Sequence, residues 1–381
     1  MPRLLYLLML CNLVMGTGVF VLGGILVPVA ESLHVSVAAA GQAMTAYAVS
    51  TALLAPLMLV LTGRWPRRAA LVFGLLLFSL GSAVCALAPS LAVLLAGRVL
   101  MGMGAVTTPI SGGIAVAMVA PAQRGRALSL VFLGVSLSYV VGMPLGAWLG
   151  FRHGWQWPVA LVALAGLAAA LALALLVPRH ITAPGASFKG LPGLLVRPAI
   201  ATTLAVTLLY FTAIFLVFSY VGPVLQALVP MSAEWLSFTL MLFGLAGVAG
   251  TLAGGWANDR FGARRTLPVQ LALLASMMLL VPLTRGHYAA MVAVFVVWGV
   301  AGFGMMAPQQ SRLATLAPAQ TPILLSLNSS MLYLGTACGA ALGGAVAAEV
   351  GYAQLSWVGV PFALAAVAVL RISLRLGDAP A

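Results

Sequence analysis

The segment that decides the fold reads Gly254-Gly255-Trp256-Ala257-Asn258-Asp259-Arg260-Phe261-Gly262-Ala263-Arg264-Arg265, and it joins two long apolar runs. It holds one of the five acidic residues of the chain and three of its eighteen basic residues. Only 6% of all residues are charged, so a cluster this dense belongs outside the lipid. A short basic loop also indicates on which side of a membrane it lies.

The composition predicts an all-α protein that crosses a membrane many times. Of the 381 residues, 63% are hydrophobic, and the mean hydropathy is +1.15. Apolar runs long enough to cross about 30 Å of hydrocarbon as a helix recur throughout the chain. The short alternating segments of a membrane β-barrel do not occur.

We expect twelve transmembrane helices, and we expect the prolines and glycines inside several of them to be tolerated because neighbouring helices re-satisfy the backbone. The predicted spans are 4–30, 39–62, 69–88, 90–119, 127–150, 156–177, 200–226, 235–257, 266–284, 288–315, 322–348 and 353–373.

The basic residues predict the orientation. With a cytoplasmic N-terminus, fifteen of the eighteen basic residues face the cytoplasm, Arg152 and Arg285 face the other side, and Arg98 lies within a span. This bias places both termini in the cytoplasm. The net charge of +13 is therefore a topology signal and does not indicate nucleic-acid binding.

Several functional classes lack their signatures. The cysteines Cys11, Cys85 and Cys338 lie in apolar runs without a spacing motif, so we expect no disulfide and no metal. The first apolar run is too long for a signal-peptide core and is expected to remain as the first span. No catalytic set and no phosphate-cradling Gly-Lys-Ser/Thr loop is present, so we expect neither an enzyme, nor ATP-driven transport, nor a cofactor.

The chain divides into two halves of six spans. The predicted division is 1–177, a cytoplasmic linker at 178–199, and 200–381. An internal repeat supports it, because the Ala-Pro-Ala-Gln at 120–123 recurs at 317–320 and Gly142 and Gly146 fall on Gly339 and Gly343 at the same shift. The opening loop has its counterpart at Thr62–Arg68, where Gly63 replaces the acid and Arg64, Arg67 and Arg68 remain.

Four places resemble the major facilitator superfamily, nearest its twelve-span bacterial drug:proton antiporter branch and the arabinose and sugar efflux permeases. They are Gly16-Thr17-Gly18-Val19-Phe20 in span 1, Ala40-Gly41-Gln42 with Thr45-Ala46-Tyr47-Ala48 in span 2, Arg98 with Gly102 and Gly104 in span 4, and Gly142-Met143-Pro144-Leu145-Gly146 in span 5. The resemblance implies two six-helix bundles around a central cavity and alternating access. Val19 and Gly63 stand where the family has acids, and the first of those acids is commonly linked to proton coupling.

The charged loop at Asp259, Arg98 and the Gly/Pro segment of span 5 each have competing interpretations. Asp259, with Arg260, Gly262, Arg264 and Arg265, either marks topology or latches a cytoplasmic gate, in which Arg64, Arg67 and Arg68 are the other half's share.

Arg98 is either structural, part of a proton relay, or an anchor for an anionic substrate group. Glu31 is the one peripheral acid that we consider for proton coupling. Gly142, Pro144 and Gly146 provide either tight packing or a bending point.

Polar and aromatic residues within the spans are candidates for a substrate site, although each could equally pair between helices. The resemblance implies that spans 1, 4, 7 and 10 line the cavity. The candidates are Asn12, Tyr47, Thr107, Thr108, Tyr139, Tyr210, Tyr220, Trp298, Gln309, Gln310, Asn328 and Tyr333.

We expect a monomeric secondary transporter in the lipid bilayer of a bacterial inner membrane that exports small amphiphilic compounds or sugars, with proton antiport as the family's usual coupling. The alternatives are a proton-independent facilitator or exchanger, including one for an organic anion near Arg98, and a non-transporting membrane scaffold.

Overall fold

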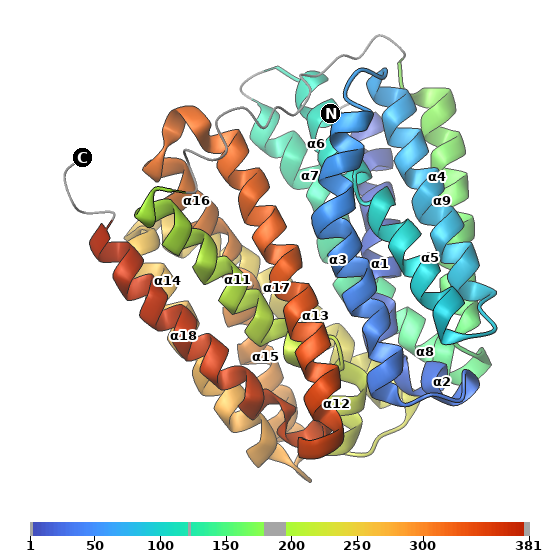
Figure 1. The fold of residues 1–381 in the computed structure, drawn as a ribbon, viewed down its shortest axis with the longest axis vertical. Coiled ribbons are helices and arrows are strands. Elements are labelled where there is room, and N and C mark those ends of the chain that lie inside the picture. Colours follow the sequence, from blue (N-terminus) through green and yellow to red (C-terminus); the bar gives the residue numbers. More distant parts are fainter. Residues whose placement is uncertain (1–2, 121–122, 179–195, 377–381) are drawn as a thin grey trace. The chain divides into compact units, whose positions relative to one another are not determined.

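The computed structural model describes residues 3–120, 123–178 and 196–376, and these residues are helical with short connections (Figure 1). Within these described residues, twelve helical segments are long and apolar enough to cross a membrane, which confirms the predicted number and class. Most of the predicted linker, 179–195, lies outside the described residues.

Contacts between residues divide the chain into two units. Unit 1 comprises Met1–Ser187 and Ser232–Met241, and unit 2 comprises Phe188–Met231 and Leu242–Ala381. The helices from the N-terminus to the linker, all in unit 1, are α1 (Arg3–Gly24), α2 (Leu26–Ser32), α3 (Val37–Leu61), α4 (Arg67–Ala86), α5 (Leu91–Gly104), α6 (Thr107–Ala117), α7 (Arg124–Leu137), the π-helix η2 (Ser138–Gly142), α8 (Met143–His153) and α9 (Gln156–Leu176).

The helices that follow are α11 (Pro198–Phe218), α12 (Val221–Leu228), α13 (Ala233–Phe261), α14 (Ala263–Leu280), α15 (Tyr288–Gly304), α16 (Met306–Leu316), α17 (Thr321–Val350) and α18 (Leu355–Leu376), with short 3-10 turns η3 (Val281–Thr284), η4 (Pro318–Gln320) and η5 (Tyr352–Gln354). Helix α13 begins among the residues grouped with unit 1 and ends in unit 2.

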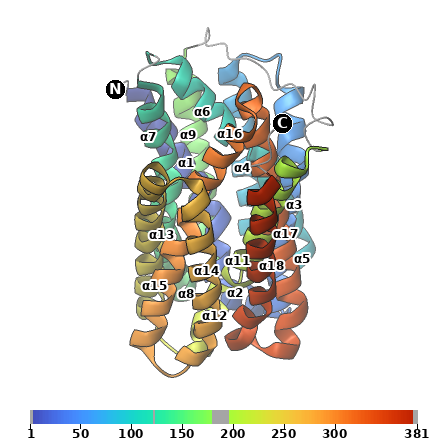
Figure 2. The ribbon, with the colours of Figure 1, turned by 90° about the vertical axis from the view of Figure 1, so that its left-hand side faces the viewer.

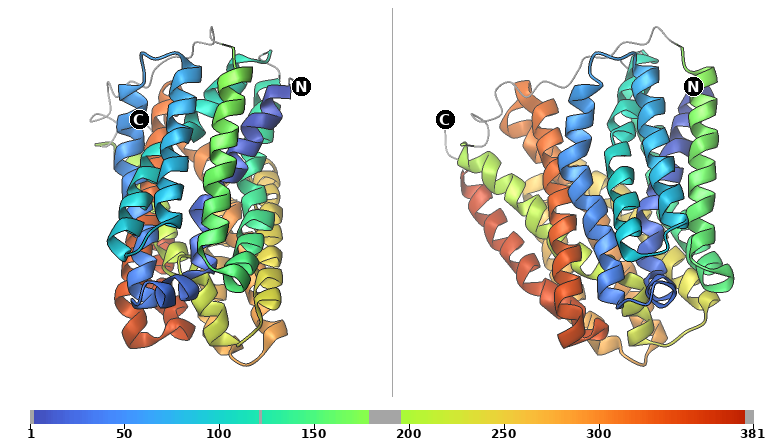
Figure 3. Two further views of the ribbon diagram at one scale, coloured as in Figure 1. Left: turned by 90° about the vertical axis from the view of Figure 1, so that its right-hand side faces the viewer. Right: turned by 45° about the vertical axis from the view of Figure 1, so that its right-hand side comes forward.

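Each unit is a bundle of adjacent helices. In unit 1, α4 packs against α5 and α9, α3 packs against α5, and α1 packs against α7 and α9 (Figures 1 and 3). In unit 2, α11 packs against α17 and α18, and α14 packs against α15 and α18 (Figure 2).

Four predicted spans are interrupted, although we expected them to be continuous. The predicted spans 4–30, 90–119, 200–226 and 288–315 break after Gly24, Gly104, Phe218 and Gly304, respectively. These are the first and fourth spans of each half.

Proline explains all four interruptions. Pro28, Pro109, Pro223 and Pro308 have no N–H group to donate to the carbonyl four residues earlier, which belongs to Gly24, Ala105, Ser219 and Gly304. The chain tightens at these points, as where the Ala105 N–H donates to the Gly102 carbonyl at 3.1 Å. The breaks fall at matching places in both halves, which agrees with the internal repeat.

Candidate functional site

Arg98 occupies the interior of unit 1, as the eighth residue of α5, and is 1% exposed. Its Nε donates to the Ala43 carbonyl at 3.1 Å, its Nη1 to the Gly18 carbonyl at 2.8 Å, and its Nη2 to the Val19 carbonyl at 3.0 Å. The guanidinium carbon also lies 4.9 Å from the centroid of the Tyr47 ring.

Backbone carbonyls therefore hold the Arg98 charge, and Val19, at the family's acid position, contributes one of them. This arrangement joins α5 to α1 and α3. It also places Tyr47, a substrate-site candidate, directly against the guanidinium.

Two further candidates of unit 1 meet through a serine that the sequence analysis did not select. The Asn12 amide of α1 donates to the Ser111 hydroxyl at 3.1 Å, and that hydroxyl donates to the Thr108 carbonyl at 2.7 Å. The Asn12 Oδ1 atom is buried without a hydrogen-bond partner among the described residues. Asn12 thus retains acceptor capacity inside the bundle.

Thr107 occupies a different environment from Thr108. It is 1% exposed, and an added Cβ on Gly74 of α4 would lie 2.5 Å from its hydroxyl. Thr107, at the beginning of α6, therefore packs against α4.

The Gly/Pro segment of span 5 contains a π-helix, η2, which leads directly into Met143 and Pro144 of α8. An added Cβ on Gly142 would overlap the Thr17 hydroxyl of α1, and one on Gly146 would overlap the Val21 side chain. Span 5 is therefore packed closely on α1 at the place where its helical geometry changes.

Tyr139 lies within η2, and its ring stacks on Phe20 of α1 with centroids 4.4 Å apart. Phe20 directly follows Val19 in the sequence. The stacked pair gives unit 1 an aromatic surface with a phenol group at its edge.

A buried polar network crosses unit 2. The Gln309 amide of α16 donates to the Thr203 carbonyl at 2.6 Å and to the Thr207 hydroxyl at 2.9 Å, and that hydroxyl donates to Asn328 Oδ1 of α17 at 2.6 Å. Gln309 is 2% exposed and Asn328 is fully buried. Both amides were predicted as site candidates from the sequence, whereas Thr207, which lies between them, was not.

The network continues to Arg312, which we had counted only as a basic residue of the cytoplasmic side. Its Nε donates to the Thr203 hydroxyl at 3.3 Å, and its Nη2 donates to the Ser373 carbonyl of α18 at 2.5 Å and to the Ser373 hydroxyl at 3.1 Å. Arg312 is 9% exposed. The three-residue spacing between Gln309 and Arg312, which places them on one helix face, was the available signal.

Trp298 and Tyr210 belong to the aromatic core of unit 2. The Trp298 ring lies 5.2 Å from Phe243 and 5.5 Å from Phe295, between ring centroids, and Trp298 is 1% exposed. Tyr210 is 3% exposed and packs edge-on against Phe211 at 4.8 Å.

The remaining candidates lie apart from these clusters. The Tyr220 hydroxyl donates to the Ala340 carbonyl at 3.0 Å, and Gln310 and Tyr333 are half-buried on α16 and α17. Glu31 is exposed near the end of α2.

The charged loop that joins α13 to α14 turns at Gly262, whose φ of 75° is accessible to glycine and unfavourable for other residues. Asp259 is exposed and forms no ion pair with any residue that the structure describes. The Arg260 guanidinium lies over the rings of Trp256 and Phe261, at 5.9 and 5.7 Å from their centroids. Arg265 is exposed in the first turn of α14.

The corresponding loop of unit 1 shows how such arginines can support a fold. Arg68 donates to the Val177 carbonyl at the end of α9, at 3.3 Å, and Arg67 is 4% exposed, whereas Arg64 is exposed. Two of its three arginines are therefore part of the packed end of unit 1.

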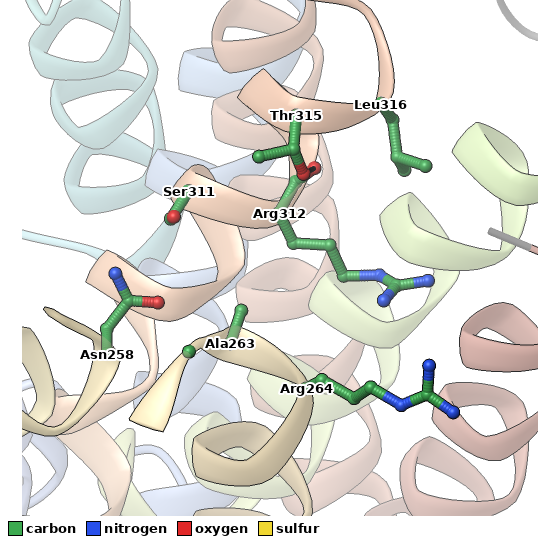
Figure 4. Close-up of a pocket in the computed structure, with 8 residues that line it drawn as sticks. Asn258, Ala263, Arg264, Ser311, Arg312, Thr315 and Leu316 are labelled. Carbon is green, nitrogen blue, oxygen red and sulfur yellow. Dashed lines mark hydrogen bonds between the residues drawn. The ribbon is translucent and has the colours of Figure 1, made fainter. Parts of the chain in front are cut away.

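A pocket of about 330 Å³ opens beside the charged loop of unit 2 (Figure 4). Its lining consists of Asn258, Gly262, Ala263, Arg264, Ser311, Arg312, Thr315 and Leu316. No group of three or more His, Cys, Asp or Glu side chains able to hold a metal occurs within residues 3–120, 123–178 and 196–376.

Comparisons with known proteins agree with this architecture. The sequence matches the profile of the Major Facilitator Superfamily over residues 8–320 and 231–380. It is 32% identical to the inner membrane transport protein YdhP of Escherichia coli (strain K12) over 363 residues, covering 94% of this chain and 93% of that protein. It is 28% identical to the MFS-type transporter YbcL of Bacillus subtilis (strain 168) over 356 residues, covering 93% and 91%.

The fold is similar to the crystal structure of a bacterial homologue of the human lysosomal transporter Spinster in an inward-facing and occupied conformation. The TM-score is 0.81 at 17% identity, over 98% of this chain and 96% of that one.

Proposed function

The chain belongs to the major facilitator superfamily, and from that premise we propose that this secondary transporter of the bacterial inner membrane exports small amphiphilic compounds by alternating access. Transport by the family and its relatives is the established part. The direction, the substrate class and the coupling are the proposal.

The observation that carries the proposal is the interruption of the first and fourth spans of each half. Those are the helices that line the cavity in the family. A helix interrupted at a proline can change the angle between its two segments without unfolding either, which suits a site that opens alternately.

The character of the candidate residues supports an amphiphilic substrate. Unit 1 contains Tyr139 stacked on Phe20 and the buried amide of Asn12, and unit 2 contains the buried amides of Gln309 and Asn328. Aromatic surface beside neutral hydrogen-bonding groups favours compounds with one apolar and one polar end, and the sugars that we also considered would use chiefly the amides.

Two candidates remain for the coupling of transport, namely proton antiport and proton-independent exchange or facilitated diffusion. Proton antiport needs a group that gains and loses a proton during the cycle, and all four described acids, namely Glu31, Glu234, Asp259 and Glu349, are exposed. Carbonyls already hold Arg98, and no acid that the structure describes forms an ion pair with it. This favours the second candidate, proton-independent exchange or facilitated diffusion, unless Glu31 carries the proton.

Asp259 enters the proposal as a gate residue. It is exposed at the end of α13, beside the turn at Gly262, and could bind an arginine or a helix N-terminus in another conformation. We expect Asp259→Asn to slow transport while insertion and folding remain normal, and normal transport by this variant would remove the gate role.

Proteoliposomes test the proposal directly. Substrate counterflow is measured for an amphiphilic dye and for radiolabelled arabinose, each with and without an imposed pH gradient. Saturable dye flux supports the proposed substrate class, and its response to the gradient separates antiport from exchange. Flux of arabinose alone would replace the substrate class, and the absence of flux of either compound would contradict the proposal.

A further inference from the structure

We propose that the pocket beside the α13–α14 loop binds a phosphate group. Its polar lining combines the arginines Arg264 and Arg312 with the hydroxyls of Ser311 and Thr315 and the amide of Asn258, and none of the described lining residues is acidic. Arginine and hydroxyl donors together are the usual ligands of phosphate oxygens in proteins.

Arg312 makes the site rigid. Its guanidinium is held by the Thr203 hydroxyl and by the carbonyl and hydroxyl of Ser373, and the residue is 9% exposed. A side chain fixed in this way loses little conformational entropy when an anion binds nearby. Figure 4 shows Arg312 and Arg264 extending toward the same side of the pocket, from α16 and α14.

The duplicated half provides an internal comparison. At the shift of 199 that aligns Pro109 with Pro308 and the bounds of α6 with those of α16, Ser311, Arg312 and Thr315 correspond to Gly112, Gly113 and Val116. The fold therefore does not require polar residues on this face of the helix. Only unit 2 has placed a cation and two hydroxyls there.

The arginines of the two corresponding loops, Arg68 in unit 1 and Arg264 in unit 2, also have different surroundings. In unit 1, Arg68 donates to the Val177 carbonyl at the end of α9. In unit 2, Arg312 donates to the Ser373 carbonyl near the end of α18, and Arg264, the counterpart of Arg68, lines the pocket. The arginine that supports the fold in one half thus contributes to a pocket in the other.

Asn258 adds an independent indication. Its Oδ1 atom is buried and has no hydrogen-bond partner within the described part of the chain, and Figure 4 shows the amide beside Ala263 and Ser311. An acceptor among cationic donors suits a ligand that also carries a hydroxyl, such as hydrogen phosphate or the glycerol of a phospholipid headgroup. Ala263 and Arg264 begin α14, and because the first N–H groups of a helix have no intrahelical acceptor, this end of α14 adds to the preference for an anion.

The test measures phosphate binding to the purified full-length protein by isothermal titration, at matched ionic strength with sodium chloride as the reference. Arg264→Gln should weaken binding by at least about tenfold, as expected for a lost hydrogen bond to a charged group. Arg260→Gln removes the same charge from the same loop, where it packs on Trp256 and Phe261, and should bind phosphate as the unchanged protein does.

A second variant avoids disturbing the arginines. Ser311→Ala with Thr315→Val removes both hydroxyls with little change in side-chain volume, and it should also lose phosphate binding. The absence of saturable phosphate binding by the unchanged protein, or equal binding by Arg264→Gln, would overturn the proposal.

The source of the phosphate is resolved in nanodiscs of phosphatidylcholine with and without phosphatidylglycerol. Competition between phosphatidylglycerol and free phosphate identifies a lipid headgroup as the ligand, and phosphate binding unchanged by the lipid identifies a soluble phosphate. Either result supports the pocket. Because binding is measured without transport, it is independent of the proposed export function.

Discussion

The Arg152 guanidinium donates to the Glu234 carboxylate, with Nη2 2.6 Å and Nε 3.2 Å from the same Oε1 atom. Arg152 is in the last turn of α8 and Glu234 in the first turn of α13, so the pair fastens the beginning of α13 to unit 1. Helix α13 then continues into unit 2. Both side chains are about half exposed.

We predict that this ion pair influences transport through the position of α13. Glu234→Gln should change the transport rate by less than about fivefold, because exposed pairs are weak, and high salt should reproduce part of the effect in the unchanged protein. The reversed pair, Arg152→Glu with Glu234→Arg, should restore the rate. If both variants transport alike, the charge pairing has no role.

Arg98 yields a prediction that separates structure from coupling. Arg98→Met should lower the melting temperature, because the charge-assisted hydrogen bonds to the Ala43, Gly18 and Val19 carbonyls are lost, each contributing about 1.5–3 kcal/mol. Arg98→Lys should retain part of the stability.

The measurement is thermal unfolding in detergent together with the pH dependence of flux. Loss of pH-dependent flux by Arg98→Lys, with its stability kept, would assign Arg98 to a proton relay. Equal loss of stability and flux supports the structural role.

The twelve spans could be predicted because long apolar runs separated by charged loops leave few alternatives. The interruptions could also have been found, since each follows from a proline four residues after an affected carbonyl, as with Pro109 and Ala105. The presence of a proline alone does not decide whether a span is interrupted, however. Pro56 lies inside the continuous helix α3 and Pro361 inside α18.

The site was less predictable because polar side chains inside a membrane protein are defined by their partners. The sequence indicates Gln309 and Asn328 but not that Thr207 joins them, since a threonine in an apolar helix usually bonds its own backbone. Arg312 was hidden for another reason. An arginine near the end of a span is usually assigned to the cytoplasmic loops, whereas in the structure Arg312 is buried and donates to Ser373.

Proline interruptions should matter for the rate of transport more than for folding. Pro308→Ala restores an N–H group for the Gly304 carbonyl, so we expect α15 and α16 to form a more continuous helix and transport to slow by about tenfold or more. Pro56→Ala, within an uninterrupted helix, is the control and should transport normally. Flux in proteoliposomes and melting temperature are measured for both, and normal flux with Pro308→Ala would show that the break is not used.

Thr207 should hold the polar network of unit 2 together. Thr207→Val leaves the Gln309 amide and the Asn328 Oδ1 atom without this partner, and we expect a loss of about 1–3 kcal/mol in stability. Thr202→Val, on the same helix, removes a hydroxyl that bonds only the preceding turn and should cost little. Equal melting temperatures for the two variants would contradict a stabilising network.

The contact between Gly142 and Thr17 gives the sharpest test of span 5. Gly142→Ala should reduce stability and transport, because the new methyl group overlaps the Thr17 hydroxyl. Thr17→Ala removes that hydroxyl and should recover part of the loss in the double variant, which a double-mutant cycle measures as a coupling of about 0.5–3 kcal/mol. Gly134→Ala is the contrasting case, because its methyl group meets the Met9 backbone carbonyl, which no side-chain change removes. Thr17→Ala should therefore leave Gly134→Ala unrescued. Rescue of both variants, or of neither, would mean that the close approach of span 5 to α1 does not depend on the pairing of Gly142 with Thr17.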